Sequence, residues 1–311
     1  MTSNLVTIPI VAVLAALMIA GSIATLLRAD VTVDRDDYAE VLHLHRRATG
    51  WRFLGLIAAV VTTLALTVGG LGANLFGPGL AAAVAPAASA IVFLLAICLS
   101  ELTIRRSETP TRTAQVTARR VRDLLPRGPL ALALIALALL GAVLVGGVML
   151  GSADDLGRAG RSLSATCTDA AGTVTGNQSH GPWPGSYYAI PIAVAALIAI
   201  ALSAITLAVI SRRPSPGTES TSLDLVLRQW SGRDVLHALA LAAFATMSPV
   251  LALMALAAGH MECGPGWFGT LATGAAIASA LSAGAALGLF TLLMIGPTLR
   301  VPPEASPQVR R

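Results

Sequence analysis

The 311-residue sequence contains no lysine, and all 21 of its basic residues are arginine. A Schiff base to retinal or to pyridoxal phosphate requires a lysine amine. The absence of lysine therefore excludes both cofactors and, with them, the retinal-binding seven-helix proteins. We expect no other cofactor.

Charge is also scarce, since 12% of the residues are charged and 55% are hydrophobic, and the mean hydropathy is +0.75. Soluble domains are roughly half apolar and a quarter charged. The apolar residues gather in runs of about 20, the length that a helix needs to cross a bilayer. These features predict an all-α integral membrane protein. The wealth of Ala, Gly, Pro and Arg, whose codons are GC-rich, is typical of a bacterial gene.

Familiar catalytic signatures are missing as well. The sequence contains no nucleophile motif, phosphate-binding loop or dinucleotide fingerprint. No Asp, Glu, Arg or His lies in the central part of a predicted span. Proton-coupled carriers generally place an ionisable residue there, so this pattern disfavours a proton-coupled carrier.

The arginines predict how the chain is oriented in the membrane. All but Arg158 and Arg161 fall in segments that the positive-inside rule assigns to the cytoplasm. We therefore interpret the net charge of +5 as a topology signal and expect no nucleic-acid partner. Seven transmembrane helices result, with the N-terminus outside and the C-terminus in the cytoplasm of the bacterial inner membrane. The predicted helices cover residues 5–27, 53–73, 80–101, 129–150, 188–210, 236–258 and 267–295.

These spans belong to one domain, residues 1–311, with an extracytoplasmic loop at 151–187 and a cytoplasmic tail at 296–311. Three apolar stretches resemble one another because each opens near a proline and closes on arginine; they cover residues 7–28, 86–106 and 189–213. The hairpin turns share Pro-Gly, and the linkers AEVLHLHRRATGWR, VTARRVRDLLPRG and LDLVLRQWSGRD are similarly amphipathic. The sequence thus predicts half a unit plus three parallel hairpin repeats, with amphipathic linkers at the cytoplasmic surface.

Two of the three cysteines, Cys167 and Cys263, fall in predicted outer loops. Cysteines on an oxidising face most simply form a disulfide. The alternative is a metal site that also uses His180 and His260. Only the three-residue spacing between His260 and Cys263 supports it. We expect the disulfide and no metal.

Loops often carry function, so the outer acidic and imidazole groups form a candidate outer-face site, although they match no catalytic spacing. Its members are Asp154, Asp155, His180, His260 and Glu262.

On the inner side, Asp36, Glu40 and His43 recur at helical spacing. A metal or acid/base site is one interpretation, and a solvated face paired with arginine is the favoured one.

Two further features concern the helices themselves. Ser248 and Pro249 lie in the middle of a predicted span, where proline kinks a helix and forms either a hinge or a packing notch. Ala280, Gly284 and Gly288 belong to a stripe of small residues at every fourth position, which lets another helix approach closely. That helix belongs either to this chain or to another.

These observations favour a non-catalytic accessory, scaffold or regulatory partner of a membrane complex. Its protein partner would bind the cytoplasmic linkers or the outer loop, and the bilayer would surround the helices. A transport-related membrane component that is not proton-coupled is the alternative. A membrane-embedded enzyme with a site at the outer face is a second alternative, and an enzyme is the less expected outcome.

Overall fold

The computed structural model describes residues 21, 30–32, 38–68, 79–103, 125–168, 171–212, 221–295 and 298–300. The first predicted span, residues 5–27, lies outside this part of the chain except for Gly21, so the count of seven helices stays a prediction. Asp36 and the tail from residue 301 also lie outside it.

Within these described ranges, six helices are long and apolar enough to cross a membrane. This finding confirms the prediction of a helical membrane protein, with six helices of sufficient length in the described residues. The helices are α2 (Tyr38–Thr67), α4 (Leu80–Leu102), α5 (Arg127–Leu150), α6 (Ser186–Arg212), α7 (Thr221–Gly259) and α8 (Trp267–Ile295).

Two helices extend well beyond the predicted spans. α2 begins at Tyr38 and α7 at Thr221, although the sequence predicted starts at residues 53 and 236. Residues 38–52 and 221–235, directly before these spans, contain no proline that would interrupt the helical hydrogen bonding. The interpretation of these two linkers as separate surface helices is therefore wrong, because each is the first part of a continuous long helix.

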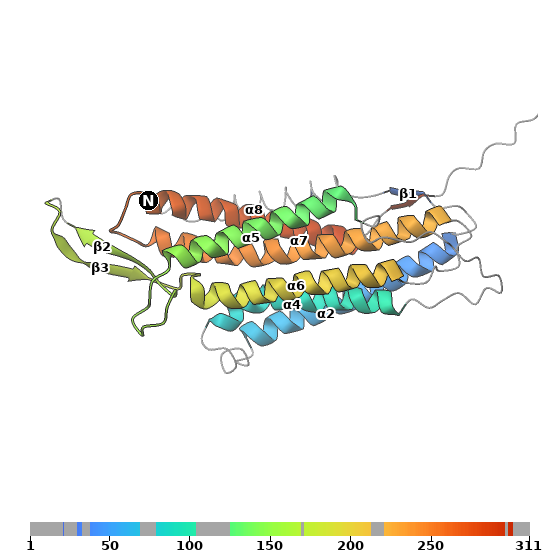
Figure 1. The fold of residues 1–311 in the computed structure, drawn as a ribbon, viewed down its shortest axis with the longest axis horizontal. Helices are drawn as coiled ribbons and strands as arrows, with labels where there is room; N and C mark the ends of the chain where they lie inside the picture. The colour runs from blue at the N-terminus through green and yellow to red at the C-terminus, as the bar shows by residue number, and fades with distance from the viewer. Residues whose placement is uncertain are drawn as a thin grey trace, which may run out of the picture.

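The helices run along the long axis of the molecule in two groups, as Figure 1 shows. α2 packs against α4 and α4 against α6, whereas α5 and α8 pack against α7. α7 also contacts α4 and α6, and it thereby joins the groups. α5 and α6 follow one another in the chain but make few contacts with each other.

The two ends of the bundle differ in composition. We call the end where α4, α6 and α8 finish and α2 and α7 begin the basic end. The opposite end, which we call the hairpin end, carries the antiparallel strands β2 (Leu163–Thr168) and β3 (Val174–His180). The buried indole of Trp183 donates a hydrogen bond of 2.7 Å to the Gly147 carbonyl and fixes this loop to α5.

A second pair of strands joins distant parts of the chain at the basic end. β1 (Asp30–Thr32) and β4 (Thr298–Arg300) pair in parallel, with Asp30 opposite Thr298. β4 follows α8 after two residues. β1 therefore lies close to the end of α8.

Small residues allow the helices to approach closely, as is usual in membranes where van der Waals packing replaces the hydrophobic effect. At Gly55 in α2, an added Cβ atom would lie 2.6 Å from the Cβ atom of Ala96 in α4. At Gly141 in α5, an added Cβ atom would meet nothing within 4 Å. Only the first of these two glycines is required by helix packing.

We expect Gly55→Ala to destabilise the fold by about 1–3 kcal/mol, because overpacking forces neighbouring atoms apart. Gly141→Ala is the matched control and should be neutral or stabilising by up to about 1 kcal/mol, since alanine favours helix. Chemical unfolding in detergent micelles measures both. Equal stability of the two variants would contradict the close contact of α2 with α4.

Candidate functional site

Arginine side chains reach the ends of three helices at the basic end. Arg47 of α2 donates to the carbonyl of Thr103, the C-cap residue of α4. Arg228 of α7 donates to the carbonyl of Ile210, 2.6 Å away in the last turn of α6. Arg52 of α2 donates to the carbonyl of Leu293, 3.0 Å away near the end of α8.

These contacts provide hydrogen-bond donors for carbonyl groups at helix C-termini. The last four carbonyls of a helix have no partner within the helix, and a positive charge is favourable at that end. α4, α6 and α8 each receive an arginine from a different helix. Their C-terminal ends are therefore tied to the beginnings of α2 and α7.

Two of these arginines are buried. Arg52 is 5% exposed and Arg228 is 1% exposed. A buried charge is costly unless it is paired and hydrogen-bonded. Arg52 meets this requirement through an ion pair with Asp234 of α7, which is also buried. The guanidinium of Arg52 also lies 5.9 Å from the ring centre of Trp230, which adds a cation–π contact.

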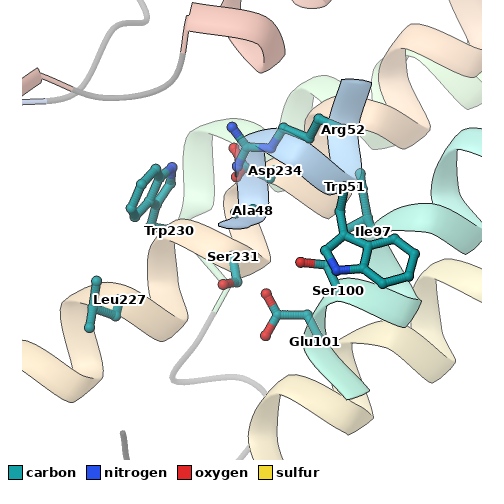
Figure 2. A pocket seen from close by; sticks show the side chains of 10 residues that line it. All are labelled: Ala48, Trp51, Arg52, Ile97, Ser100, Glu101, Leu227, Trp230, Ser231 and Asp234. Atoms are coloured by element: carbon teal, nitrogen blue, oxygen red, sulfur yellow. Dashed lines mark hydrogen bonds and ion pairs between the residues drawn. The ribbon is translucent and has the colours of Figure 1, made fainter. Parts of the chain in front are cut away.

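A cavity of about 50 Å³ adjoins this ion pair. Its volume exceeds the ~10–15 Å³ that a single water needs. In Figure 2 the indoles of Trp51 and Trp230 lie on different sides of the space, and the Glu101 carboxylate lies away from the ion pair. The lining comes from α2, α4 and α7 and comprises Ala48, Trp51, Arg52, Ile97, Ser100, Glu101, Leu227, Trp230, Ser231 and Asp234.

His237 lies one turn beyond Asp234 in α7 and is 2% exposed. Its Nε2 atom is buried and has no hydrogen-bond partner within the described part of the chain. Buried polar atoms are usually paired, so this imidazole adds a further polar group near the basic end.

The cavity contains groups that can bind a ligand. Its carboxylates, hydroxyls and indoles can hold water or one small polar group. Among the residues that the structure describes, no three His, Cys, Asp or Glu side chains converge as a metal site would require. The Asp234 carboxylate is engaged by Arg52.

At the hairpin end, the structure brings part of the candidate outer-face site together. The rings of His180 and His260 have centres 5.0 Å apart. Gln178 joins β3 to the turn between α7 and α8, because its side-chain carbonyl accepts hydrogen bonds from the backbone N–H groups of Glu262 and Cys263 at 3.0 and 3.1 Å. The Glu262 side chain itself is exposed.

The two aspartates of the candidate outer-face site lie in the loop before β2. Asp155 is exposed. Asp154 accepts a hydrogen bond of 2.7 Å from Nε of Arg158 and lies 3.7 Å from Nη1 of Arg161. Desolvation acts to raise the pKa of Asp154, but the hydrogen bonds from Arg158 outweigh it and hold that pKa below its usual range. This stabilisation is present at neutral pH and is lost as the pH falls through the lowered pKa. Asp154 thus stabilises the loop to which it belongs.

Cys167 and Cys263 lie at disulfide distance, with Cα atoms 5.2 Å apart. The pair connects β2 to the turn between α7 and α8. The geometry fits the disulfide that the sequence predicts. Cys98 is buried in α4.

The structure also describes the predicted proline kink in α7 and the predicted stripe of small residues in α8. α7 continues through Pro249, and the hydroxyl of Ser279 in α8 donates to the Ser248 carbonyl at 2.8 Å. This contact joins α8 to α7 beside the proline, which suits the packing interpretation. A hinge motion stays a prediction. In α8, Gly284 and Gly288 are buried.

Sequence reasoning missed the polar cluster at the basic end. Arg52, Asp234 and Glu101 lie at the ends of spans, where a solvated position is the ordinary expectation for a charge. A signal was present, because Arg52 follows Gly50 by two residues and Asp234 follows Gly232 by two residues in similar linkers. This similarity could have suggested that the two linkers lie side by side and that Arg52 forms an ion pair with Asp234.

The ion pair makes a quantitative prediction. Arg52→Leu should destabilise the protein by about 3–5 kcal/mol, because it leaves Asp234 buried without its partner. The double variant Arg52→Leu with Asp234→Leu should lose less than the sum of the single variants. Arg46→Leu, at an exposed position of the same helix, should change stability by no more than about 0.5 kcal/mol.

Urea unfolding of the detergent-solubilised protein measures these differences. Equal effects of Arg52→Leu and Arg46→Leu would show that the buried pair does not hold α2 to α7.

No protein-family model matches the chain, and no curated protein and no solved structure is significantly similar to it.

Proposed function

We propose that this chain is a non-catalytic component of a membrane complex, an accessory, scaffold or regulatory protein of the bacterial cytoplasmic membrane. The observation that carries the proposal is the dense apolar packing at the centre of the bundle. The cavity between α4, α5, α6 and α7 measures about 10 Å³, which is at most the ~10–15 Å³ needed for one water. Ala, Leu and Ile line it, together with Thr246, whose hydroxyl is bonded to the Ala242 carbonyl.

The polar groups at the two ends support the same proposal. Arg52 and Arg228 are engaged by helix carbonyls and by Asp234. At the other end, Trp183 is fully buried. These arginines and Trp183 therefore serve the fold, which leaves the exposed ends of the bundle to bind a partner.

The proposed orientation places the basic end in the cytoplasm and the hairpin end outside. Exposed arginines from different helices support it, because Arg46, Arg127 and Arg212 all lie at the basic end. The cysteine pair lies at the other end, where an oxidising environment would maintain a disulfide. The proposed parallel repeat has its support in α2 and α7, each of which begins a hairpin and is prolonged at the basic end.

A transport-related component is the second candidate function. The observation that favours it is the polar cavity of about 50 Å³ at the basic end. A site of this kind can receive a small polar solute from one side. The apolar packing between this cavity and the hairpin end makes it the less supported candidate.

Orientation and disulfide are tested together by thiol labelling of intact cells after outer barriers are made permeable. A membrane-impermeant maleimide should leave the native protein unlabelled and should label Cys167 in a Cys263→Ser variant. Cys98 is buried in α4, and Cys98→Ala serves as the control for background. Labelling of the variant only after the membrane is opened would reverse the proposed orientation.

The function itself is tested by extracting the tagged chain from its native membrane in a mild detergent. We expect a second protein at fixed stoichiometry and a complex mass larger than that of the chain alone. The purified chain in proteoliposomes should show no flux above that of empty vesicles.

A single species at the mass of the chain, together with solute flux that Glu101→Gln abolishes, would instead establish the transport-related candidate. Glu101→Gln keeps the size of the side chain and removes its charge. Leu95→Gln, an exposed position on the same helix, is the control for nonspecific effects.

A further inference from the structure

The cavity at the basic end has a polar floor and a partly aromatic rim. The polar side chains of the floor are each at most 8% exposed and are Arg52, Ser100, Glu101 and Asp234. The rim consists of partly buried residues, namely Ala48, Trp51, Trp230 and Ser231. The cavity is partly open, so a small ligand can reach the polar groups of the floor.

The charges of this lining favour a cation. Two carboxylates and one guanidinium line the cavity, and the guanidinium of Arg52 is already bound to the Asp234 carboxylate and to the Leu293 carbonyl. The Glu101 carboxylate lies away from that ion pair (Figure 2). Glu101 also belongs to the last turn of α4, where the helix dipole favours positive charge. The space beside Glu101 therefore attracts a cation through both the carboxylate and the helix end.

The lining also provides several hydrogen-bond acceptors. Glu101 takes part in another interaction within the structure, but an ionised carboxylate has about four acceptor positions and can serve a ligand as well. Ser100 of α4 and Ser231 of α7 add hydroxyl oxygens to the same lining. A primary ammonium group carries three N–H donors, so these acceptors suit it.

The two indoles are a second reason to expect a cation. Cations are attracted to aromatic faces, and most strongly to that of Trp. Trp230 shows this preference in the structure, because the guanidinium of Arg52 lies 5.9 Å from its ring centre. Trp51 lies on a different side of the space (Figure 2). A bound cation would therefore have carboxylate, hydroxyl and indole groups as neighbours.

The volume of the cavity limits the size of the ligand. Its 50 Å³ correspond to roughly three to five water positions of ~10–15 Å³ each. Ethanolamine has a matching size and carries a primary ammonium group. Choline has the same charge, but it is larger and its nitrogen has no N–H donor. The lining therefore favours a primary ammonium on a short chain.

The cavity lies where the lipid-facing surface of α2 begins. Arg46 is exposed on the basic side of the cavity, whereas Phe53 and Leu54, directly after it, are apolar and 53% and 54% exposed. A tryptophan at such a boundary, here Trp51, typically lies among the lipid headgroups. The ammonium group can therefore come from a dissolved amine or from the headgroup of an ethanolamine phospholipid.

We propose that this cavity binds a primary ammonium group, with Glu101 as its counter-ion. The hydroxyls of Ser100 and Ser231 accept its hydrogen bonds, and Trp51 and Trp230 lie beside it. The inference rests on the cavity that supports the transport-related candidate function, and it also suits a regulatory component that responds to a small molecule. Binding at equilibrium requires neither flux nor a protein partner, so a failure of this inference is distinct from a failure of either function.

Titration of the full chain with ethanolamine tests the proposal in detergent micelles that contain phosphatidylglycerol, a lipid without an amine. Tryptophan fluorescence is the readout, because Trp51 and Trp230 line the cavity. We expect a saturable change with ethanolamine. Ethylene glycol, which has the same number of non-hydrogen atoms and no charge, should bind at least about tenfold more weakly, the factor that one hydrogen bond to a charged group provides. Choline should also bind more weakly.

Glutamate variants locate the counter-ion. Glu101→Gln should weaken ethanolamine binding by about tenfold or more, because it removes the charge and keeps the size of the side chain. Glu262→Gln is the matched control, since it removes an exposed carboxylate at the hairpin end, and it should leave the affinity unchanged. Equal affinities of the two variants would overturn the proposal. A response to ethylene glycol or to acetate as strong as that to ethanolamine would do the same.

Tryptophan variants give a second test that does not require Glu101→Gln to fold. Trp51→Phe keeps an aromatic ring and should reduce the fluorescence change at saturation. Trp267→Phe, at a 45% exposed position of the hairpin end, should leave that change as it is. If the two variants give the same change, the ligand does not occupy this cavity.

The source of the ammonium group is identified by replacing phosphatidylglycerol with phosphatidylethanolamine in the micelles. A lower apparent affinity for free ethanolamine would show that the lipid headgroup competes for the site. An unchanged affinity would identify a dissolved amine as the ligand. Either result supports recognition of an ammonium group, whereas the absence of any response in phosphatidylglycerol would overturn it.

Discussion

The carbonyl groups at the ends of α4, α6 and α8 impose the constraint on which the basic end depends. A helix that ends near a membrane boundary leaves its last carbonyls without partners in the helix, and unsatisfied polar groups are costly in an apolar medium. Arg47, Arg52 and Arg228 satisfy one helix end each. Because these arginines belong to α2 and α7, they connect these two helices to the ends of α4, α6 and α8, and the bundle closes at this end.

This use of arginine changes how the basic composition is understood. Arginine suits the task because its planar guanidinium has several donors and stays charged when buried. Arg52 shows the consequence, since one side chain bonds a carbonyl of α8 and the Asp234 carboxylate of α7. Some charges that mark orientation in the sequence are therefore structural in the fold.

The hairpin end and the membrane interior are stabilised by different means. At the hairpin end, the strands β2 and β3 would be marginal alone, and Gln178 and the Cys167–Cys263 pair attach them to the turn between α7 and α8. In the interior, close contacts such as Gly55 with Ala96 replace polar interactions. A protein organised in this way has rigid ends and a dense centre, which suits the proposed role as a component that binds a partner rather than one that conducts a solute.

The sequence by itself determined the membrane class, the positions of spans such as 80–101 and 267–295, and the pairing of Cys167 with Cys263, because long apolar runs and outer-loop cysteines have few alternative uses. It did not determine where α2 and α7 begin, since a helix can continue through a polar linker whenever its charges find partners. Nor could it place Arg52 beside Asp234, because these side chains are 182 residues apart in the sequence and meet only through the packing of α2 and α7 on α4. Tertiary structure decided these points, since the cost of burying a charge depends on what lies next to it in space.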